Sequence, residues 1–251
     1  MSHSLSGYGL KQWRLKACAL VLAAALSGCA TPAGENVDYD PWEPMNRGLY
    51  RASYVIDGVL LKPITEVYRG VVPEQGRVMV HNAVENIASP ITFGNSVLQG
   101  DPYNSFATLW RFLINSTFGI AGLFDVATEI GLTNRKTDFG QTLALYGVES
   151  GPYLFLPVLG PPGARDGLGR VFDAFMHPAM YVDDTGSSVA LWATAAVDAR
   201  SENYNLINDV YKSSLDPYVT FRSGYVQRRA NEIKKARADR KASWKKAGFT
   251  E

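Results

Sequence analysis

Cysteine and histidine are scarce in this sequence. Its 251 residues include two cysteines, Cys18 and Cys29, and three histidines, His3, His81 and His177. Neither a disulfide pair nor a Cys/His cluster with metal-ligand spacing is therefore predicted. His81 and His177 have no recognisable ligand or catalytic pattern around them, so we expect neither a metal site nor a cofactor.

Catalytic signatures are also missing. The chain has no Gly-x-Ser-x-Gly elbow, no His-Glu-x-x-His, no phosphate-binding loop and no dinucleotide fingerprint. Its acidic residues are scattered and indicate no carboxylate pair. The sequence thus favours a protein that is not an enzyme and has no catalytic residues. An anchored periplasmic hydrolase stays open as an alternative.

No apolar run reaches the roughly 20 residues that a membrane-spanning helix needs. The run at 17–25 follows the basic residues Lys11, Arg14 and Lys16 and precedes Leu-Ser-Gly-Cys at 26–29. A basic start, a short apolar region and small residues before a cut are typical of a secretory signal. A Cys directly after Leu-Ser-Gly resembles the bacterial lipoprotein signal, in which that Cys is acylated.

We therefore expect a signal peptide over 1–28 and lipidation, palmitate included, at Cys29. An ordinary signal peptide with an incidental Cys is the alternative. Several acyl chains on one residue would anchor the chain firmly, whereas one chain binds only marginally. The residue after the Cys is Ala30 and not Asp, the usual signal for retention in the inner membrane, and this favours the outer membrane.

Charge is unevenly distributed along the mature chain. From Arg222 to the end there are ten Lys/Arg and three Asp/Glu, a net of +7, whereas residues 29–221 carry 12 basic and 21 acidic residues, a net of −9. A basic C-terminal tail on an acidic chain gives information about binding partners but does not determine the fold. Nucleic acid is not an expected partner for a secreted lipoprotein.

Apolar spacing predicts a mainly α protein with little strand. Helix starts are expected at Pro44, Pro63, Pro73, Pro90 and Pro102. Further helices are expected over 106–115, from Asp138, from 165 to 175, as one long helix over 187–211, and from Pro217. We expect a flexible linker over 29–39, a helical domain over 40–229 and a solvated basic tail over 230–251.

Two segments are harder to assign. In 116–125, two glycines three residues apart fit either close approach between helices or a turn after a helix end, and both alternatives stay open. Residues 146–162 are rich in Gly, Pro and large apolar residues, which predicts an ordered loop or ribbon.

An ordered set of short patterns resembles the MlaA/VacJ lipoprotein family. They are DPWEPMNR at 40–47, LQGD at 98–101, RFLINST at 111–117, GLFDVA at 122–127, DFGQTL at 138–143, GPY at 151–153, LP at 156–157, LGP at 159–161, RD at 165–166 and DPY at 216–218. Each is weak alone, but together and in this order they are specific. Met45 departs from the Phe that is usual there.

The resemblance implies a ring of short amphipathic helices lying in one membrane leaflet around an amphipathic channel. It implies an outer-membrane lipoprotein that removes mislocalised phospholipids from the outer leaflet, maintains lipid asymmetry and passes the lipids to a periplasmic carrier. The implied partners are phospholipids, the outer-membrane bilayer, trimeric porins and that carrier. A structural or porin-associated envelope lipoprotein is the other alternative.

Polar residues inside apolar helices supply candidates for the channel, because such residues at membrane depth face a cavity or a partner. We expect the channel to be lined or shaped by some of Asn46, Arg47, Arg111 and Asn115. The Gly-rich region between ordered elements is the candidate for a movable gate. Its members are Phe139, Gly140, Gln141, Gly147, Gly151 and Tyr153.

Overall fold

The computed structural model describes residues 40–157, 160 and 162–246. Its helices in chain order are α2 (Glu43–Ile56), η1 (Asp57–Leu61), α3 (Lys62–Val71), α4 (Glu74–Leu98), α5 (Pro102–Thr117), α6 (Val126–Glu129), α7 (Phe139–Leu145), α8 (Ala164–Met176), η2 (Pro178–Tyr181), α9 (Thr185–Glu202), α10 (Tyr204–Ser213) and α11 (Pro217–Lys246). Extended structure among these residues amounts to two isolated antiparallel bridges, between Tyr153 and Gly163 and between Leu156 and Gly160. The prediction of a mainly α fold is confirmed.

Several helix starts follow the predicted caps. Proline occupies the first turn of α2, α3 and α5, where its missing N–H costs no hydrogen bond. The Asp101 side chain accepts a hydrogen bond from the backbone N of Asn104, and that of Asp138 accepts one from Gln141. The first three elements form one continuous helical path, because the π-helical η1 joins α2 directly to α3.

The predicted helix start at Pro90 is wrong, because Pro90 lies inside α4. An internal proline removes one backbone hydrogen bond and normally kinks or ends a helix. Here the helix continues to Leu98, with the Ser89 hydroxyl donating to the Glu85 carbonyl at 3.1 Å beside the proline and with α5 packed along it. Tertiary packing thus overrides the local signal.

The predicted single helix over 187–211 is also wrong. The chain leaves helical geometry at Asn203, which separates α9 from α10. The Asn203 side chain donates to the Ala199 carbonyl at 2.8 Å and so satisfies one of the carbonyls at the end of α9. Asparagine competes for backbone hydrogen bonds in this way, and this explains the break.

The glycines of 116–125 form a turn after the end of α5. Gly122 has a φ of 92°, a conformation that favours glycine, and a Cβ there would lie 2.5 Å from the Cβ of Asn86 on α4. Of the two alternatives, the turn is correct. The turn itself packs closely against a neighbouring helix.

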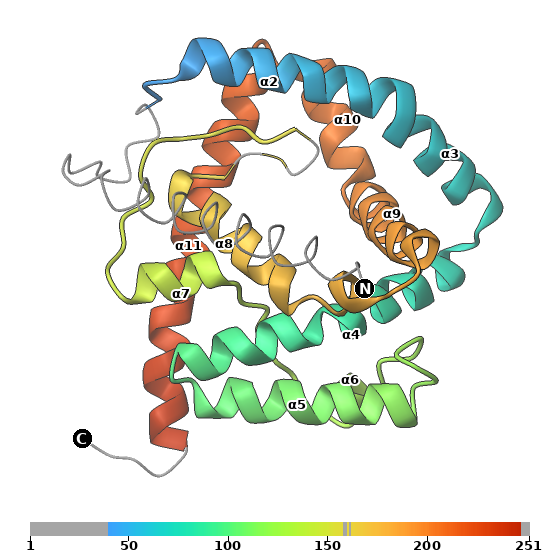
Figure 1. The fold of residues 1–251 in the computed structure, drawn as a ribbon, viewed down its shortest axis with the longest axis vertical. Helices are drawn as coiled ribbons and strands as arrows, with labels where there is room; N and C mark the ends of the chain where they lie inside the picture. Colours follow the sequence, from blue (N-terminus) through green and yellow to red (C-terminus); the bar gives the residue numbers. More distant parts are fainter. Residues whose placement is uncertain (1–39, 158–159, 161, 247–251) are drawn as a thin grey trace, which may run out of the picture. The chain divides into compact units, whose positions relative to one another are not determined.

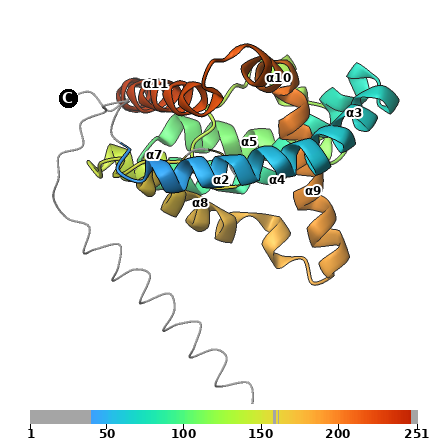
Figure 2. The same ribbon diagram turned by 90° about the horizontal axis from the view of Figure 1, so that it is seen from above.

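Contacts between helices close a circuit. In order, the contacts join α2 to η1, η1 to α3, α3 to α9, α9 to α4, α4 to α5, and α5 to α11. The circuit returns to α2 through the ring contact of Tyr50 with Tyr218 and the ion pair of Arg47 with Asp216. Figure 1 shows this order, with α7 and α8 placed between α11 and α4. Figure 2 shows α10 and α11 on one side of α2 and α8 on the other.

The helix α11 continues through residue 230 without a break. Ile233, Ala236 and Ser243 are buried, and the Ser243 hydroxyl accepts a hydrogen bond from the backbone N of Tyr103 at 2.9 Å. The basic stretch is therefore packed on the helical body as far as Ser243, while Lys234 and Lys235 lie on its exposed face.

Buried polar residues outnumber buried apolar residues in the described part of the chain. The apolar core centres on Tyr153, Phe155, Tyr218 and Tyr225. Many large apolar side chains are exposed instead, including Phe106 and others along α5. No described helix combines the length and the apolarity needed to cross a membrane.

The close approach of α7 and α8 supplies a first test. A Cβ on Gly169 would lie 2.8 Å from the Cα of Gly140 and would also meet its backbone N. We expect Gly169→Ala to lower the free energy of unfolding by about 1–3 kcal/mol, because backbone cannot give way as a flexible side chain can. Denaturant unfolding followed by circular dichroism measures it.

The matched control is Gly167→Ala on the same helix. Its Cβ would meet only Pro162, at an ordinary 3.7 Å, so we expect a neutral effect or a gain of up to about 1 kcal/mol from helix propensity. Equal stability of the two variants would contradict the proposed steric fit.

Candidate functional site

One cavity among the described residues has a volume of about 530 Å³, within the range typical of ligand pockets. Its walls come from α2, η1, α9, α10 and α11, and from the loop that contains Phe155 and Gly160. The apolar and aromatic residues among its lining are Tyr50, Leu61, Phe155, Ala196, Ala199, Leu206, Ile207, Val210, Tyr211, Phe221 and Tyr225.

A buried ion pair forms the polar part of this cavity wall. Arg200 on α9 contacts the carboxylate of Asp57 on η1 through Nε at 2.7 Å and Nη2 at 3.2 Å, and Nη2 also donates to Asn208 at 2.8 Å. The Nη1 atom of Arg200 is buried and has no hydrogen-bond partner among the described residues. A buried N–H of this kind is costly, and an anionic oxygen would satisfy it.

A second cation lies in the cavity lining. Arg228 on α11 lines the cavity and is mostly exposed, with its Nε 3.4 Å from Glu232. The cavity therefore presents apolar and aromatic surface together with guanidinium groups. A molecule with an anionic head and apolar chains matches this combination.

The predicted channel residues Asn46 and Arg47 lie next to this cavity but do not line it. Asn46 is fully buried: its Nδ2 donates to Asp40 and to the Tyr153 carbonyl at 3.0 Å, and its Oδ1 accepts from the Phe155 N at 2.9 Å. Asn46 thus holds the loop that forms part of the cavity wall.

Arg47 joins the first described helix, α2, to the start of the last one, α11. Its Nε contacts Glu43 and its Nη2 contacts Asp216, each at 2.7 Å, and its guanidinium lies over the Tyr218 ring. The hydrogen bond from Arg47 holds the pKa of Asp216 below its ordinary value. Asp40 strengthens the junction, since its carboxylate accepts hydrogen bonds from Tyr218 and from Arg222.

Arg111 and Asn115 line a different and smaller cavity of about 150 Å³. The Nη2 of Arg111 donates to both carboxylate oxygens of Asp125, at 2.9 and 3.0 Å, and Asn115 donates to the same carboxylate at 2.9 Å. Burial opposes ionisation of Asp125, but hydrogen bonds from Thr128, Asn115 and Arg111 outweigh it and lower the pKa. These contacts fix the turn after α5, and a channel role for either residue stays a prediction.

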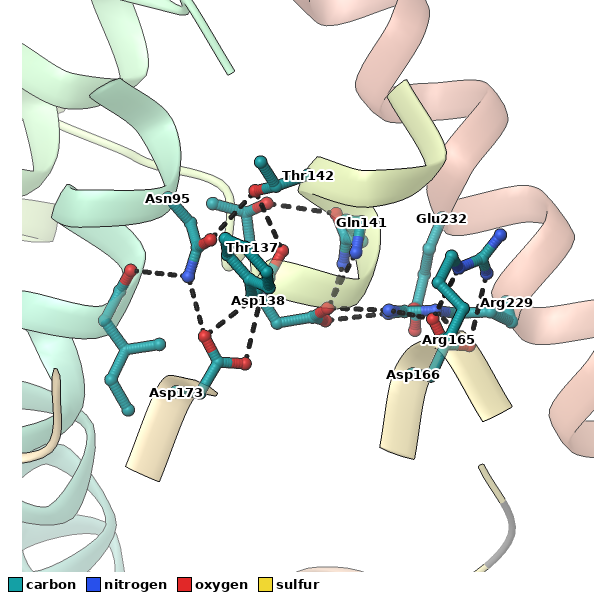
Figure 3. A network of polar contacts seen from close by, with 12 residues as sticks. Asn95, Thr137, Asp138, Gln141, Thr142, Arg165, Asp166, Asp173, Arg229 and Glu232 are labelled. Atoms are coloured by element: carbon teal, nitrogen blue, oxygen red, sulfur yellow. Dashed lines mark hydrogen bonds and ion pairs between the residues drawn. The ribbon is translucent and has the colours of Figure 1, made fainter. Parts of the chain in front are cut away.

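The first half of the predicted gate is tightly held. Phe139 stacks on Phe172 with ring centroids 4.3 Å apart, and Gly140 packs against Asp166 and Arg229. Gln141 is buried and donates from its backbone N to Asp138 at 2.9 Å. Figure 3 shows a polar cluster that includes Gln141 and Asp138 and lies between α4, α7, α8 and α11.

Ion pairs complete the cluster in Figure 3. Arg229 on α11 contacts Asp138 at 2.6 Å and Asp166 at 2.9 Å, and Arg165 contacts Asp166 at 2.9 Å. Burial raises the pKa of Asp166, but hydrogen bonds and charge from Arg165 and Arg229 outweigh burial and leave it below its ordinary value. Asp166 therefore stays ionised and joins α7, α8 and α11.

The second half of the predicted gate is a loop. Gly147 and Gly151 have positive φ angles of 90° and 66°, and an added Cβ on Gly147 would meet nothing. Tyr153 is buried in the aromatic core, and the chain then reaches Phe155 and Gly160 in the cavity wall. The gate itself stays a prediction.

Sequence reasoning missed the ion pair in the cavity. Asp57 and Arg200 are 143 residues apart, and neither belongs to a recognisable pattern. One feature of the sequence could have indicated Asp57: it is a charged residue within an apolar helical stretch, as Arg111 is. The predicted lipidation site Cys29 and part of the pattern at 159–161 lie outside the described residues.

Comparison with known proteins identifies the family. The family model described as MlaA lipoprotein matches residues 38–232. The chain belongs to the MlaA lipoprotein family. The resemblance expected from the ordered patterns is thereby confirmed, and most of those patterns prove to contain the residues that join the helices to one another.

Curated relatives agree with this assignment. Proteins named intermembrane phospholipid transport system lipoprotein MlaA are 33% identical in Haemophilus influenzae, with 83% of this chain and 86% of the relative covered, and 33% identical in Escherichia coli, with 86% and 87% covered. An uncharacterised protein of Rickettsia bellii is 37% identical, with 78% and 77% covered.

A solved structure has the same fold. It comes from work on the structural basis for maintenance of bacterial outer membrane lipid asymmetry, and it is 31% identical with a TM-score of 0.67. The similarity covers 77% of this chain and 98% of that one. The helical fold of this MlaA family member is therefore shared with a known structure.

The carboxyl group of Asp173 supplies a pH-dependent test. Burial raises its pKa to about 6, although it accepts hydrogen bonds from Asn95 at 2.8 Å and from the backbone N of Phe139. The native state thus binds the proton more tightly than the unfolded chain does. Stability from this group is present below pH 4 and is lost as the pH rises through about 6.

We expect Asp173→Asn to be more stable than the wild type near pH 7, by up to about 3 kcal/mol, and to lose this advantage toward pH 4. Denaturant unfolding across this range measures the difference. The exposed Asp183→Asn is the control and should run parallel to the wild type. A constant difference between Asp173→Asn and wild type at all pH values would refute the assignment.

Proposed function

We propose that this protein is an intermembrane phospholipid-transport lipoprotein of the outer membrane. It removes mislocalised phospholipids from the outer leaflet through an amphipathic passage and passes them to a periplasmic carrier, so that lipid asymmetry is maintained. The family and the names of the relatives support this function.

The cavity of about 530 Å³ carries the proposal. A phospholipid crosses a bilayer slowly because its charged head must pass through hydrocarbon. Aromatic and aliphatic walls suit the chains, while Arg228 and the buried Nη1 of Arg200 suit the phosphate. Such a passage lowers the barrier without bond chemistry, which agrees with a family of transport lipoproteins and with no role as an enzyme.

The distribution of apolar residues supports a place within one leaflet. Exposed large apolar residues occur on α2, η1, α4, α5 and α8, with Val59, Phe106 and Phe175 as examples. Extended exposed apolar surface marks a membrane or protein contact. Since no described helix is long and apolar enough to span, we propose that the circuit of helices forms a ring lying in the periplasmic-side leaflet.

The remaining partners belong to the same proposal. Trimeric porins would cover part of the apolar exterior, and the soluble carrier would receive lipid at the periplasmic side. We retain the gate as a proposal and place its moving part at Gly147–Gly151, because Phe139, Gly140 and Gln141 are held by close packing. This loop leads directly into the residues of the cavity wall.

Filling the cavity tests transport. Gly224 lines the cavity, and a Cβ added there meets nothing within 4 Å. We expect Gly224→Trp to keep the fold and to abolish transport, because the indole occupies the space proposed for lipid. The variant is expressed in cells that lack their own family member, and phospholipid amines at the cell surface are labelled with an impermeant reagent. Surface labelling should stay as high as in cells without the protein.

Gly48→Trp is the matched control. Gly48 lies on α2, also has open space around its Cβ, and does not line the cavity, so this variant should restore low labelling. Full activity of folded Gly224→Trp would favour the alternative of a structural envelope protein that braces porins.

Anchoring is tested at Cys29. We expect Cys29→Ser to abolish labelling with radioactive palmitate, because the thiol that starts lipid attachment is removed. Palmitate labelling that persists in Cys29→Ser would disprove this lipidation site.

A further inference from the structure

Three potential metal ligands meet where α4 packs against α9. His81 comes from α4, and Asp198 and Glu202 lie four residues apart on one face of α9. One ligand atom from each of these residues lies within 4.8 Å of the other two, and the His81 Nδ1 to Asp198 Oδ2 distance is 2.8 Å. Neither the transport function nor the cavity of about 530 Å³ uses these residues.

The three residues differ in burial. Asp198 is almost completely buried, its side chain being 5% exposed, and His81 is half-buried with 30% exposed. Glu202 is exposed, and its carboxylate makes no hydrogen bond or ion pair among the described residues. The buried carboxylate of Asp198 thus has a single side-chain partner and carries further negative charge beside it.

A buried hydroxyl next to this cluster is unsatisfied. The Tyr68 hydroxyl on α3 is buried without a hydrogen-bond partner among the described residues. Burial raises the pKa of the Tyr68 hydroxyl, and the charges of Asp198 and Glu202 raise it further against the opposing charge of Arg77. Buried polar groups are normally hydrogen-bonded, so an unpaired hydroxyl at this position needs a partner.

The cluster is open to solvent on one side. His81 lines the polar cavity of about 150 Å³, together with Asn82 and Glu85. Glu85 is itself engaged by Lys136 at 2.8 Å, so we do not count it as a ligand. A small ion can therefore enter without opening the helical packing.

We propose that His81, Asp198 and Glu202 bind one divalent transition-metal cation, with Zn²⁺ the best match. An imidazole nitrogen with two carboxylates suits Zn²⁺ better than Mg²⁺ or Ca²⁺, which prefer oxygen ligands alone. Three protein ligands leave a position for water, to which the Tyr68 hydroxyl can hydrogen-bond as an outer partner.

The bound cation would fasten α9 to α4. The same helix supplies Ala196, Ala199 and Arg200 to the large cavity, so the cation would fix one wall of that cavity. The expectation from the sequence that the chain has no metal site is replaced by this proposal. The ligands are 117 residues apart along the chain, which is why no spacing pattern shows them.

The proposal is tested by titrating zinc into the chelator-treated full chain in detergent micelles. Calorimetry measures the binding, and the thermal unfolding midpoint measures its effect on stability. We expect one saturable Zn²⁺ equivalent and a rise in the midpoint. Glu202→Gln removes a direct ligand and should lower the zinc affinity further than loss of an outer hydrogen-bond partner would. Loss of such a partner lowers metal affinity roughly 10–100-fold. The metal-free stability of Glu202→Gln should match the wild type, because Glu202 is exposed.

Tyr68→Phe separates a metal site from a structural role. It should lower zinc affinity about 10–100-fold, yet leave the metal-free protein as stable or more stable, because it removes an unsatisfied buried hydroxyl. Asp209→Asn, an exposed carboxylate on α10, is the control and should bind zinc as the wild type does.

Three results would overturn the proposal. The first is the absence of saturable zinc binding to the wild type. The second is equal affinity in the wild type and Glu202→Gln, which would leave His81 and Asp198 as a hydrogen-bonded pair alone. Tighter binding of Mg²⁺ or Ca²⁺ than of Zn²⁺ would disprove the assigned metal class.

Discussion

The ionic junction between α2 and α11 is the contact on which the cavity depends. Arg47 binds Asp216, and Asp40 binds Tyr218 and Arg222, so the start of α2 and the start of α11 are held together. Both helices line the cavity, and the aromatic core lies beside the junction. If these charges separated, the circuit of helices would open where the cavity is lined.

The junction illustrates a general property of this fold. A water-soluble protein of this size would bury its large aliphatic residues, but here polar residues such as Asn95, Asp166 and Arg229 are buried and many aliphatic ones are exposed. Buried polar groups must be paired, because an unpaired one costs about 1–3 kcal/mol. Helix packing is therefore specified by hydrogen bonds and ion pairs, and the exterior is left free to contact apolar surroundings.

Local features of the fold could be predicted from the sequence. Proline positions and the Asp101 and Asp138 caps gave correct helix starts, because these signals act within a few residues. Pro90 and Asn203 gave errors, since packing overrode one signal and a side-chain bond to the backbone ended a helix early. The ordered sequence patterns indicated the family without any knowledge of the three-dimensional structure.

The site was less predictable. The residues singled out as polar within apolar helices do occupy special positions, but Asn46 and Arg47 fasten elements beside the cavity rather than line it. The pairs Asp57–Arg200 and His81–Asp198 join residues more than 100 positions apart. Contacts of that range depend on how helices dock, and no local spacing encodes them.

The π-helical segment η1 has a consequence for how this protein tolerates changes in length. A π turn holds one more residue than an α turn, so η1 can lose a residue and become regular helix. The turn would then remain a single turn, so α2 and α3 would keep their facing, whereas a deletion inside α2 or α3 would rotate everything after it by about 100° around the helix axis. A deletion within 58–61 would also leave Asp57 in place for its ion pair with Arg200. The π segment is therefore the place in this helical path where the loss of one residue is best tolerated.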